Sequence, residues 1–495
     1  MKQLFLKFVY GVILSGVLSL AGHSQIRPDV IETQTGFYLS TSSRTPYLNR
    51  VRQYGLAPIE AQTWFVNAAM QQYYDSIRTA DQKLRPWSYS WGVEAQANLG
   101  GQNHLYLPVA HISGRFKGWE LYIGRKKETL GLADTTGTWG SYIWSGNALP
   151  LPKVQISTPN YISVLGKGFL SAKVGFSHGW FGKQRYTENY FLHQKWLYIK
   201  LGRETQKLNL MAGINQNAQW GGYSETLKDN DYASKNGHFA SDGFAYLNVV
   251  LPFKFWKRPD DRYSPYEMFY RFGNHLGTVD LGFRMKTKEG TISVFRQTPW
   301  EDGQVPELFF SGDGNYTLIY QAEGMKYVQK IGIELLNTQR QANELSKFAD
   351  WIGLKEKHPG EYQDYLNHGQ YLEGWDFTDR GIGSPAIIPL QEILLDENFE
   401  GTPVFSRDNK VIAPAMNIEG KVGLIHFLVY SGYIFSTGQE RNLRPERLGQ
   451  FSGRLRTRFP IKSIGLYGEV DIAWDKGKLY GNQTGMNVTL VKVWE

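Results

Sequence analysis

The chain has 495 residues, a formal net charge of +8 and no cysteine, and aromatic residues make up 15% of it. The lack of cysteine excludes disulfides, thiolate metal sites and thiol nucleophiles. The basic residues are spread along the chain rather than clustered, which argues against nucleic-acid binding. The many Tyr, Trp, Phe and Gly residues are typical of numerous strands joined by turns.

The N-terminal residues 1–24 have the pattern of a secretory signal peptide. Two lysines precede an apolar run at residues 8–21, and small residues follow at positions 21, 22 and 24. The run is short for a membrane-spanning helix, so a single-pass anchor is the weaker alternative. No later segment approaches 18 consecutive apolar residues. We therefore predict an exported chain that crosses any membrane with strands.

The next segment, residues 25–86, shows a spacing closer to that of helices. Apolar residues recur every four positions from Phe65 to Ile77, as on one face of a helix. A shorter helix is indicated near residues 48–51. We predict a small N-terminal helical periplasmic segment. The sequence leaves open whether it docks a partner, plugs the barrel or simply packs against a larger domain.

From residue 87 onward, apolar and polar residues alternate repeatedly. The clearest case is residues 89–99, in which every odd position is apolar and every even position is polar or glycine. A period of two sends successive side chains to opposite faces of a strand. The segment is also as long as the strands of about 9–11 residues that cross a bilayer. Further strands are predicted at residues 170–180, 208–214, 245–255, 279–285, 292–294, 464–474 and 488–494.

Two features favour a membrane barrel over a soluble sandwich. Tyr and Trp lie near predicted strand ends, as at Tyr89, Trp180 and Trp474, where the lipid headgroups would be. Short turns also alternate with long loops, as in outer-membrane barrels. We predict an all-β, transmembrane antiparallel β-barrel over residues 87–495, of about 18 strands with about 16 as the alternative. Long loops are expected at residues 126–161, 216–244, 338–389 and 391–412, with a helical stretch at 342–354.

The sequence carries no motif for catalysis. It has no phosphate-binding loop, metalloprotease helix or nucleophile elbow, so we predict no enzyme, no cofactor and no metal site. The long loops instead hold flat aromatic rings and planar polar groups, which suit the apolar faces and hydroxyls of sugars. The candidate polysaccharide-binding residues are Trp139, Trp144, Asn147, Trp220, Tyr223, Tyr371, Trp375, Asp376 and Arg380. The alternative is that these side chains only pack the loops together.

Several short stretches rich in Gly, Trp and Asn follow one another along the chain. They occupy residues 144–154, 192–195, 217–222, 273–277, 371–375 and 382–385. In order and spacing they resemble the capsule assembly Wzi family in its Bacteroidetes form. The resemblance implies an outer-membrane barrel of about 18 strands with a small periplasmic helical part.

The same resemblance implies a role at the cell surface. Members of the family are implicated in attaching or assembling capsular polysaccharide, as lectins rather than enzymes. The expected partners are capsular or extracellular polysaccharide and outer-membrane lipid, with no nucleic acid, and the expected state is a monomer. The alternative function is a porin-like channel for oligosaccharides or small solutes, because the sequence does not say whether the lumen is open.

Overall fold

A computed structural model describes residues 28–74, 86–251, 260–301, 312–341, 363–393, 401 and 403–494. The predicted signal peptide at residues 1–24 and the predicted helical stretch at 342–354 lie outside the described residues. In the described part, no helix is long and apolar enough to span a membrane.

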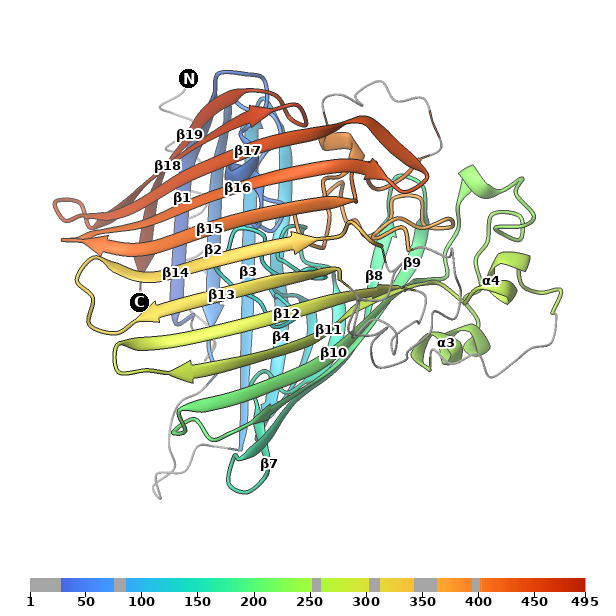
Figure 1. Cartoon of the computed structure of the whole chain (residues 1–495), viewed down its shortest axis with the longest axis horizontal. Helices are drawn as coiled ribbons and strands as arrows, with labels where there is room; N and C mark the ends of the chain where they lie inside the picture. The colour runs from blue at the N-terminus through green and yellow to red at the C-terminus, as the bar shows by residue number, and fades with distance from the viewer. Residues whose placement is uncertain are drawn as a thin grey trace, which may run out of the picture.

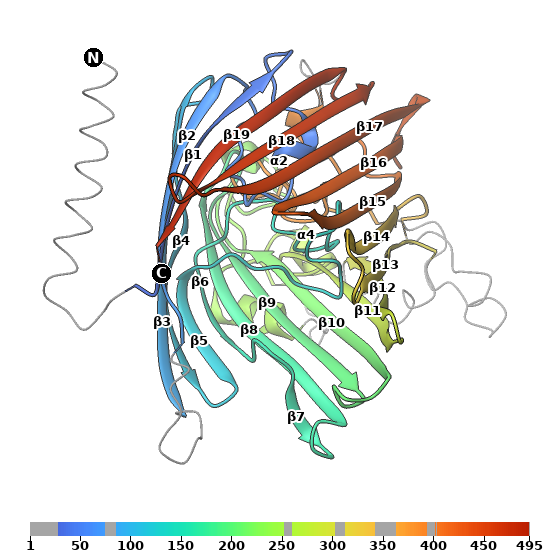
Figure 2. The same ribbon diagram turned by 90° about the vertical axis from the view of Figure 1, so that its left-hand side faces the viewer.

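The strands form one antiparallel sheet that closes on itself (Figures 1 and 2). β1 (Val30–Ser40) pairs with both β2 (Thr63–Gln72) and β19 (Gln483–Trp494), which closes the ring. β6 (Lys153–Ser157) and β7 (Ile162–Leu165) both pair with the next strand, so the nineteen described strands fill 18 positions. Closure gives each strand two neighbours and pairs the backbone groups that lipid could not satisfy. The predicted barrel and its strand number are confirmed.

The remaining strands follow in chain order around the ring. They are β3 (Trp87–Gly100), β4 (His104–Phe116), β5 (Trp119–Arg125), β8 (Leu170–Lys183), β9 (Glu188–Leu201), β10 (Leu208–Trp220), β11 (Asn274–Lys286), β12 (Gly290–Glu301), β13 (Gly314–Ala322), β14 (Val328–Asn337), β15 (Val411–Val422), β16 (Ile425–Gln439), β17 (Asn442–Ile461) and β18 (Leu466–Gly477). Except for residues 245–255, every predicted strand coincides with one of these.

The outer face of the barrel is apolar. On β19 the alternating residues Met486, Val488 and Leu490 are exposed, while Thr489 between them is buried. On β4 the side chain of Ile112 is 73% exposed. Exposed aliphatic side chains beside buried polar ones reverse the pattern of a water-soluble protein. This face is therefore the lipid-contacting belt of a membrane barrel.

The two ends of the barrel differ in the length of their connections. One end carries short turns at residues 117–118, 287–289 and 423–424, and the other carries long segments at 126–152 and 221–273. In Figure 1 the short turn between β11 and β12 lies on the left, and the long connection between β10 and β11 lies on the right. Outer-membrane barrels have short periplasmic turns and long extracellular loops. The short-turn end is therefore the periplasmic end.

The predicted N-terminal helical segment is wrong for the described residues. Residues 30–40 and 63–72 are strands β1 and β2, so the barrel begins at Val30 and not at residue 87. Only one helical turn, α2 (Tyr47–Arg50), lies between these strands, inside the barrel (Figure 2). The apolar spacing of four misled the prediction because four is an even number. Residues four apart share a face of a strand as well as of a helix.

The predicted strand at residues 245–255 is also wrong where the structure describes it. Residues Gly243–Val250 form helix α3, which begins where the side chain of Asp242 accepts a hydrogen bond of 2.8 Å from the Ala245 amide. This hydrogen bond caps the helix, because it pairs a backbone N–H of the first turn that has no partner within the helix. A strand has no such terminus. The other short helices in the described part of the chain are α4 (Pro265–Phe269), η1 (Glu225–Leu227) and η2 (Leu390–Glu392).

Candidate functional site

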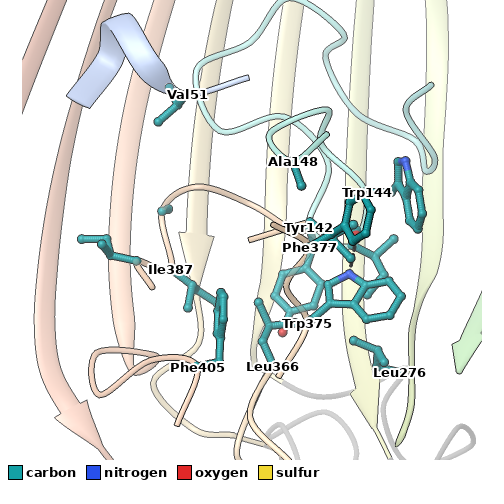
Figure 3. Packing of buried hydrophobic residues seen from close by; sticks show 14 of the residues in the cluster. Val51, Tyr142, Trp144, Ala148, Leu276, Leu366, Trp375, Phe377, Ile387 and Phe405 are labelled. Carbon is teal, nitrogen blue, oxygen red and sulfur yellow. Dashed lines mark hydrogen bonds between the residues drawn. The ribbon is translucent and has the colours of Figure 1, made fainter. Parts of the chain in front are cut away.

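Four loop segments fold back into the barrel and fill much of its lumen. They comprise residues 41–62, 126–152, 363–393 and 403–410, and we call them the plug. Figure 3 shows their aromatic and aliphatic side chains gathered between the barrel strands. The core of this protein thus lies inside the barrel and is built mainly from loops.

Buried tryptophans join the plug segments to one another and to the wall. The rings of Trp144 and Trp375 meet edge to face, with centroids 6.0 Å apart. The Trp375 indole N–H donates to the carbonyl of Ile143 at 2.8 Å. The Trp139 indole N–H donates to the carbonyl of Ala413 on β15 at 3.0 Å. The rings of Trp139 and Trp375 therefore combine apolar burial with a satisfied polar atom, which fixes their orientation.

A buried group of three charges joins the first loop to the third. The Glu392 carboxylate lies between Arg50 of α2, with which it forms an ion pair, and Arg380, whose guanidinium nitrogen is 2.9 Å away. Arg380 also donates to the carbonyl of Ala57 at 3.0 Å. Burial alone would raise the pKa of Glu392, but the two guanidinium groups hold this pKa below its ordinary value. The carboxylate therefore stays ionised and fastens the plug.

The predicted polysaccharide-binding residues do not form one exposed surface. Eight of them are buried, namely Trp139, Trp144, Asn147, Trp220, Tyr371, Trp375, Asp376 and Arg380. Seven of the eight belong to the plug, and Trp220 packs against α3 on the outside of β10. Only Tyr223 is partly exposed, in the loop after β10. The predicted ligand surface is corrected accordingly, because the buried rings supply packing, which was the alternative interpretation.

A different group of aromatic side chains is exposed at the extracellular end. Tyr232, Phe269 and Tyr270 are 50%, 67% and 43% exposed. Together with Tyr266 they form what we call the outer aromatic patch. Centroid distances are 6.0 Å for Tyr232–Tyr266, 4.7 Å for Tyr266–Tyr270 and 4.9 Å for Phe269–Tyr270. The patch is therefore accessible from the cell exterior.

Hydrogen bonds and a ring contact hold the outer aromatic patch in place against the neighbouring loops. Helix α4 carries most of it and begins with a capping box, in which Ser264 and Glu267 bond to each other's backbone amides. Burial raises the pKa of the Glu267 carboxyl, which also accepts a bond of 2.7 Å from the Ala240 amide. The ring of Tyr266 contacts His368 of the plug at 5.6 Å. The patch is therefore held on a structured base.

The sequence contains a signal for this patch that the prediction missed. Ser264 and Glu267 have the spacing of a capping box, and Pro265 stands at the first helical position. The aromatic residues Tyr266, Phe269 and Tyr270 then recur at spacings of three and four. Interpreting the preceding segment as a strand removed the helical context in which this pattern has meaning.

The comparisons with known proteins agree with this architecture. Residues 67–243 match the sequence model of the family described as capsule assembly protein Wzi. The resemblance to the Wzi family is confirmed. Together with the apolar belt, the match places this Wzi-like barrel in the outer membrane. No curated protein sequence matches the chain.

The chain is also similar to solved structures. Wzi from Escherichia coli, described as an outer membrane protein involved in group 1 capsule assembly and as a carbohydrate-binding β-barrel, has a TM-score of 0.55 and 13% identity. The similarity covers 94% of this chain and 84% of that chain. OccAB4 from Acinetobacter baumannii has a TM-score of 0.45 and 8% identity, covering 95% of this chain and 99% of that chain.

Proposed function

We propose that this Wzi-like barrel is an outer-membrane, lectin-like protein that helps attach or assemble capsular or extracellular polysaccharide at the cell surface. The match of residues 67–243 to a capsule assembly family supports this role, and so does the carbohydrate binding stated for Escherichia coli Wzi. The observation that carries the proposal is the outer aromatic patch, because its rings are exposed at the extracellular end, where such a polymer lies.

The chemistry of the patch suits a sugar polymer. Exposed aromatic rings can stack on the apolar faces of sugar rings, as they do on other flat apolar groups. Beside the patch, Arg262 pairs with Asp260 at 2.7 Å on the surface, and this pair offers planar groups to sugar hydroxyls. We propose binding rather than catalysis, by a monomer that needs no cofactor.

The filled lumen argues against the porin-like alternative. A diffusion pore needs a continuous water-filled channel, whereas here the apolar core of the plug occupies the interior of the barrel. The purified protein should therefore carry little current in planar lipid bilayers. A steady, large single-channel conductance would favour the pore.

The proposed function is tested in cells that make the polymer. Deleting the protein should release polymer into the medium without stopping its synthesis. The double variant Tyr232→Ala/Phe269→Ala should lower the cell-bound fraction several-fold while the barrel remains in the outer membrane. The matched control is Tyr327→Ala, because Tyr327 is also 50% exposed but lies at the periplasmic end. Polymer that stays on the deletion strain would overturn the proposal.

A further inference from the structure

A polar cavity of about 460 Å³ remains between the plug and one side of the barrel wall. Its wall consists of side chains from β1–β3 and β15–β19, and its roof of plug residues around Val51, Tyr54 and Thr136. This volume falls within the range of about 300–1,000 Å³ that small-molecule sites occupy. The space is thus large enough for a short saccharide but not for folded protein.

The cavity lies on the periplasmic side of the plug. Glu469 is three residues from the start of β18, and Leu428 is three residues from the start of β16. Glu419 is three residues from the end of β15. All three positions are close to the short turns, whereas the plug enters from the opposite end. The cavity is therefore separate from the outer aromatic patch.

The charges that line the cavity cancel one another. Its lining holds four cationic side chains (Arg52, Lys127, Arg454 and Arg456) and four anionic ones (Glu94, Glu419, Glu469 and Asp471). Three neutral pairs are formed, with Arg454 to Asp471 at 2.8 Å and both Arg456 to Glu469 and Lys127 to Glu94 at 2.7 Å. An anionic or cationic ligand would gain no net attraction from such a lining.

The other lining groups suit a ligand rich in hydroxyls. The amides of Gln34, Asn67 and Asn487 can both donate and accept hydrogen bonds, and the rings of Tyr38 and Tyr430 supply aromatic surface. The paired carboxylates and guanidinium groups keep further donor and acceptor positions. Planar polar groups beside aromatic rings are the combination that sugars need. An apolar ligand would leave these groups unpaired, at considerable cost.

The roof of the cavity has a strained backbone. Arg52 and Tyr54 have φ angles of +55° and +52°, although neither is glycine. Neighbouring plug residues hold this conformation, because the Tyr54 amide donates to the Gly146 carbonyl at 2.9 Å and the Arg52 amide donates to the Asn147 side chain at 3.0 Å. Non-glycine residues in this region cluster at functional sites, where strain serves to position side chains. Here both side chains line the cavity.

We propose that this cavity is a second carbohydrate site, which binds an uncharged di- or trisaccharide from the periplasmic side. Tyr54 supplies a ring face, and the Arg456–Glu469 pair supplies hydrogen bonds to sugar hydroxyls. The site goes beyond the proposed surface function, since it faces the other compartment and shares no residue with the outer aromatic patch.

The test uses the purified full-length barrel in detergent. Calorimetric titration with three neutral trisaccharides (maltotriose, cellotriose and chitotriose) should give saturable binding for at least one. The charged control, trigalacturonate, should bind at least tenfold more weakly. Tyr54→Gly removes the ring, so it should lower the affinity at least tenfold while the protein remains a folded barrel in detergent.

Further variants separate this site from the surface function. Glu469→Gln should also weaken binding, whereas Phe269→Ala in the outer aromatic patch should leave it unchanged. Polymer retention on cells should be the same for Tyr54→Gly as for wild type. The proposal is overturned if no neutral trisaccharide binds, if trigalacturonate binds equally well, or if Tyr54→Gly leaves the affinity intact. Loss of polymer retention on cells that carry Phe269→Ala would instead test the surface function of the outer aromatic patch, independently of the cavity.

Discussion

The wall and the plug bury their side chains by opposite rules. On the wall, Ile112 is 73% exposed toward lipid, whereas polar residues such as Gln297 are fully buried toward the lumen. In the plug, Trp375 is fully buried and the charges of Arg50 and Glu392 are buried with it. The wall thus resembles an inverted soluble protein, and the plug resembles the core of an ordinary one.

The two regions also differ in how far apart in sequence their contacts lie. Most wall strands pair with the strands next to them in the chain, so each contact is local and the pattern repeats many times. The plug depends on a few distant contacts, such as the pair of Arg50 and Glu392, which are 342 residues apart. A repeated local pattern tolerates single changes, whereas a small set of distant contacts does not. Four predictions test this comparison.

The largest effect is expected from Glu392→Ala in the plug. This change leaves the guanidinium groups of Arg50 and Arg380 buried without a counter-charge, which typically costs about 3–5 kcal/mol. The plug should loosen, and limited proteolysis of the intact barrel should then cleave the loop segments within the lumen. The control Glu446→Ala breaks an exposed pair with Lys478 and should cost no more than about 1 kcal/mol. Equal protease resistance of both variants would contradict the role of the buried charges.

The next largest effect is expected from Ile112→Arg on the lipid-facing belt. A charge near the middle of the bilayer typically costs about 2–4 kcal/mol in barrels, falling to about 0–1 kcal/mol near the interface. Equilibrium unfolding from lipid vesicles would measure the loss. His104→Arg is the matched control, because His104 is exposed at the extracellular end of the same strand. If both variants lose the same stability, this face is not the lipid belt.

A smaller effect is expected from Trp375→Phe in the plug. Phenylalanine keeps most of the apolar volume but removes the N–H that bonds to the Ile143 carbonyl. Leaving that buried acceptor unpaired should cost about 1–3 kcal/mol. Denaturant unfolding would measure the change, and Trp494→Phe, at an exposed position on the terminal strand, is the control. A neutral result would mean that packing alone fixes the indole.

The smallest effect is expected from lowering the pH to just below 4.5, where the folded Glu392 carboxylate is only partly protonated. The folded pKa of Glu392 lies below its ordinary value of 4.5, so its contribution is complete above about pH 4.5 and is lost as the pH falls through the folded pKa. Burial and the neighbouring Asp379 and Glu373 raise the pKa of Asp376, which favours the folded state at low pH and partly offsets this loss. Protease sensitivity of the plug should rise below pH 4.5 in the wild type. In Glu392→Gln the plug should be sensitive to protease at every pH, with no further rise below pH 4.5.

The sequence predicted most of the wall because its physics is local. Alternation at residues 89–99 and 208–214 reports directly which side chains meet lipid, and the structure places β3 and β10 there. The spacing from Phe65 failed because a period of four satisfies a strand and a helix equally. The segment after Gly243 failed because a continuous apolar run does not distinguish the two, and the Asp242 cap decided in favour of the helix.

The sequence predicted which kinds of side chain the long loops contain, but not where those side chains lie. The sequence indicated that rings such as Trp139 and Trp375 are numerous in the long loops, and that observation holds. It could not indicate that these loops turn inward, because exposure of a loop ring depends on contacts such as that between Trp139 and the distant Ala413 carbonyl. Among the described residues of the extracellular loops, the exposed rings include those of Tyr232, Phe269 and Tyr270.

By itself, then, the sequence determined a closed, lipid-facing barrel of the right size and a resemblance to the Wzi family. The tertiary structure alone decided that the lumen is filled, that Arg380 holds Glu392 rather than facing a sugar, and that a balanced, polar cavity remains under the roof at Tyr54. The reason is physical. Alternation along a strand is fixed by backbone geometry one residue at a time, whereas the inside of the barrel is filled by whichever distant segments best bury their rings and pair their charges.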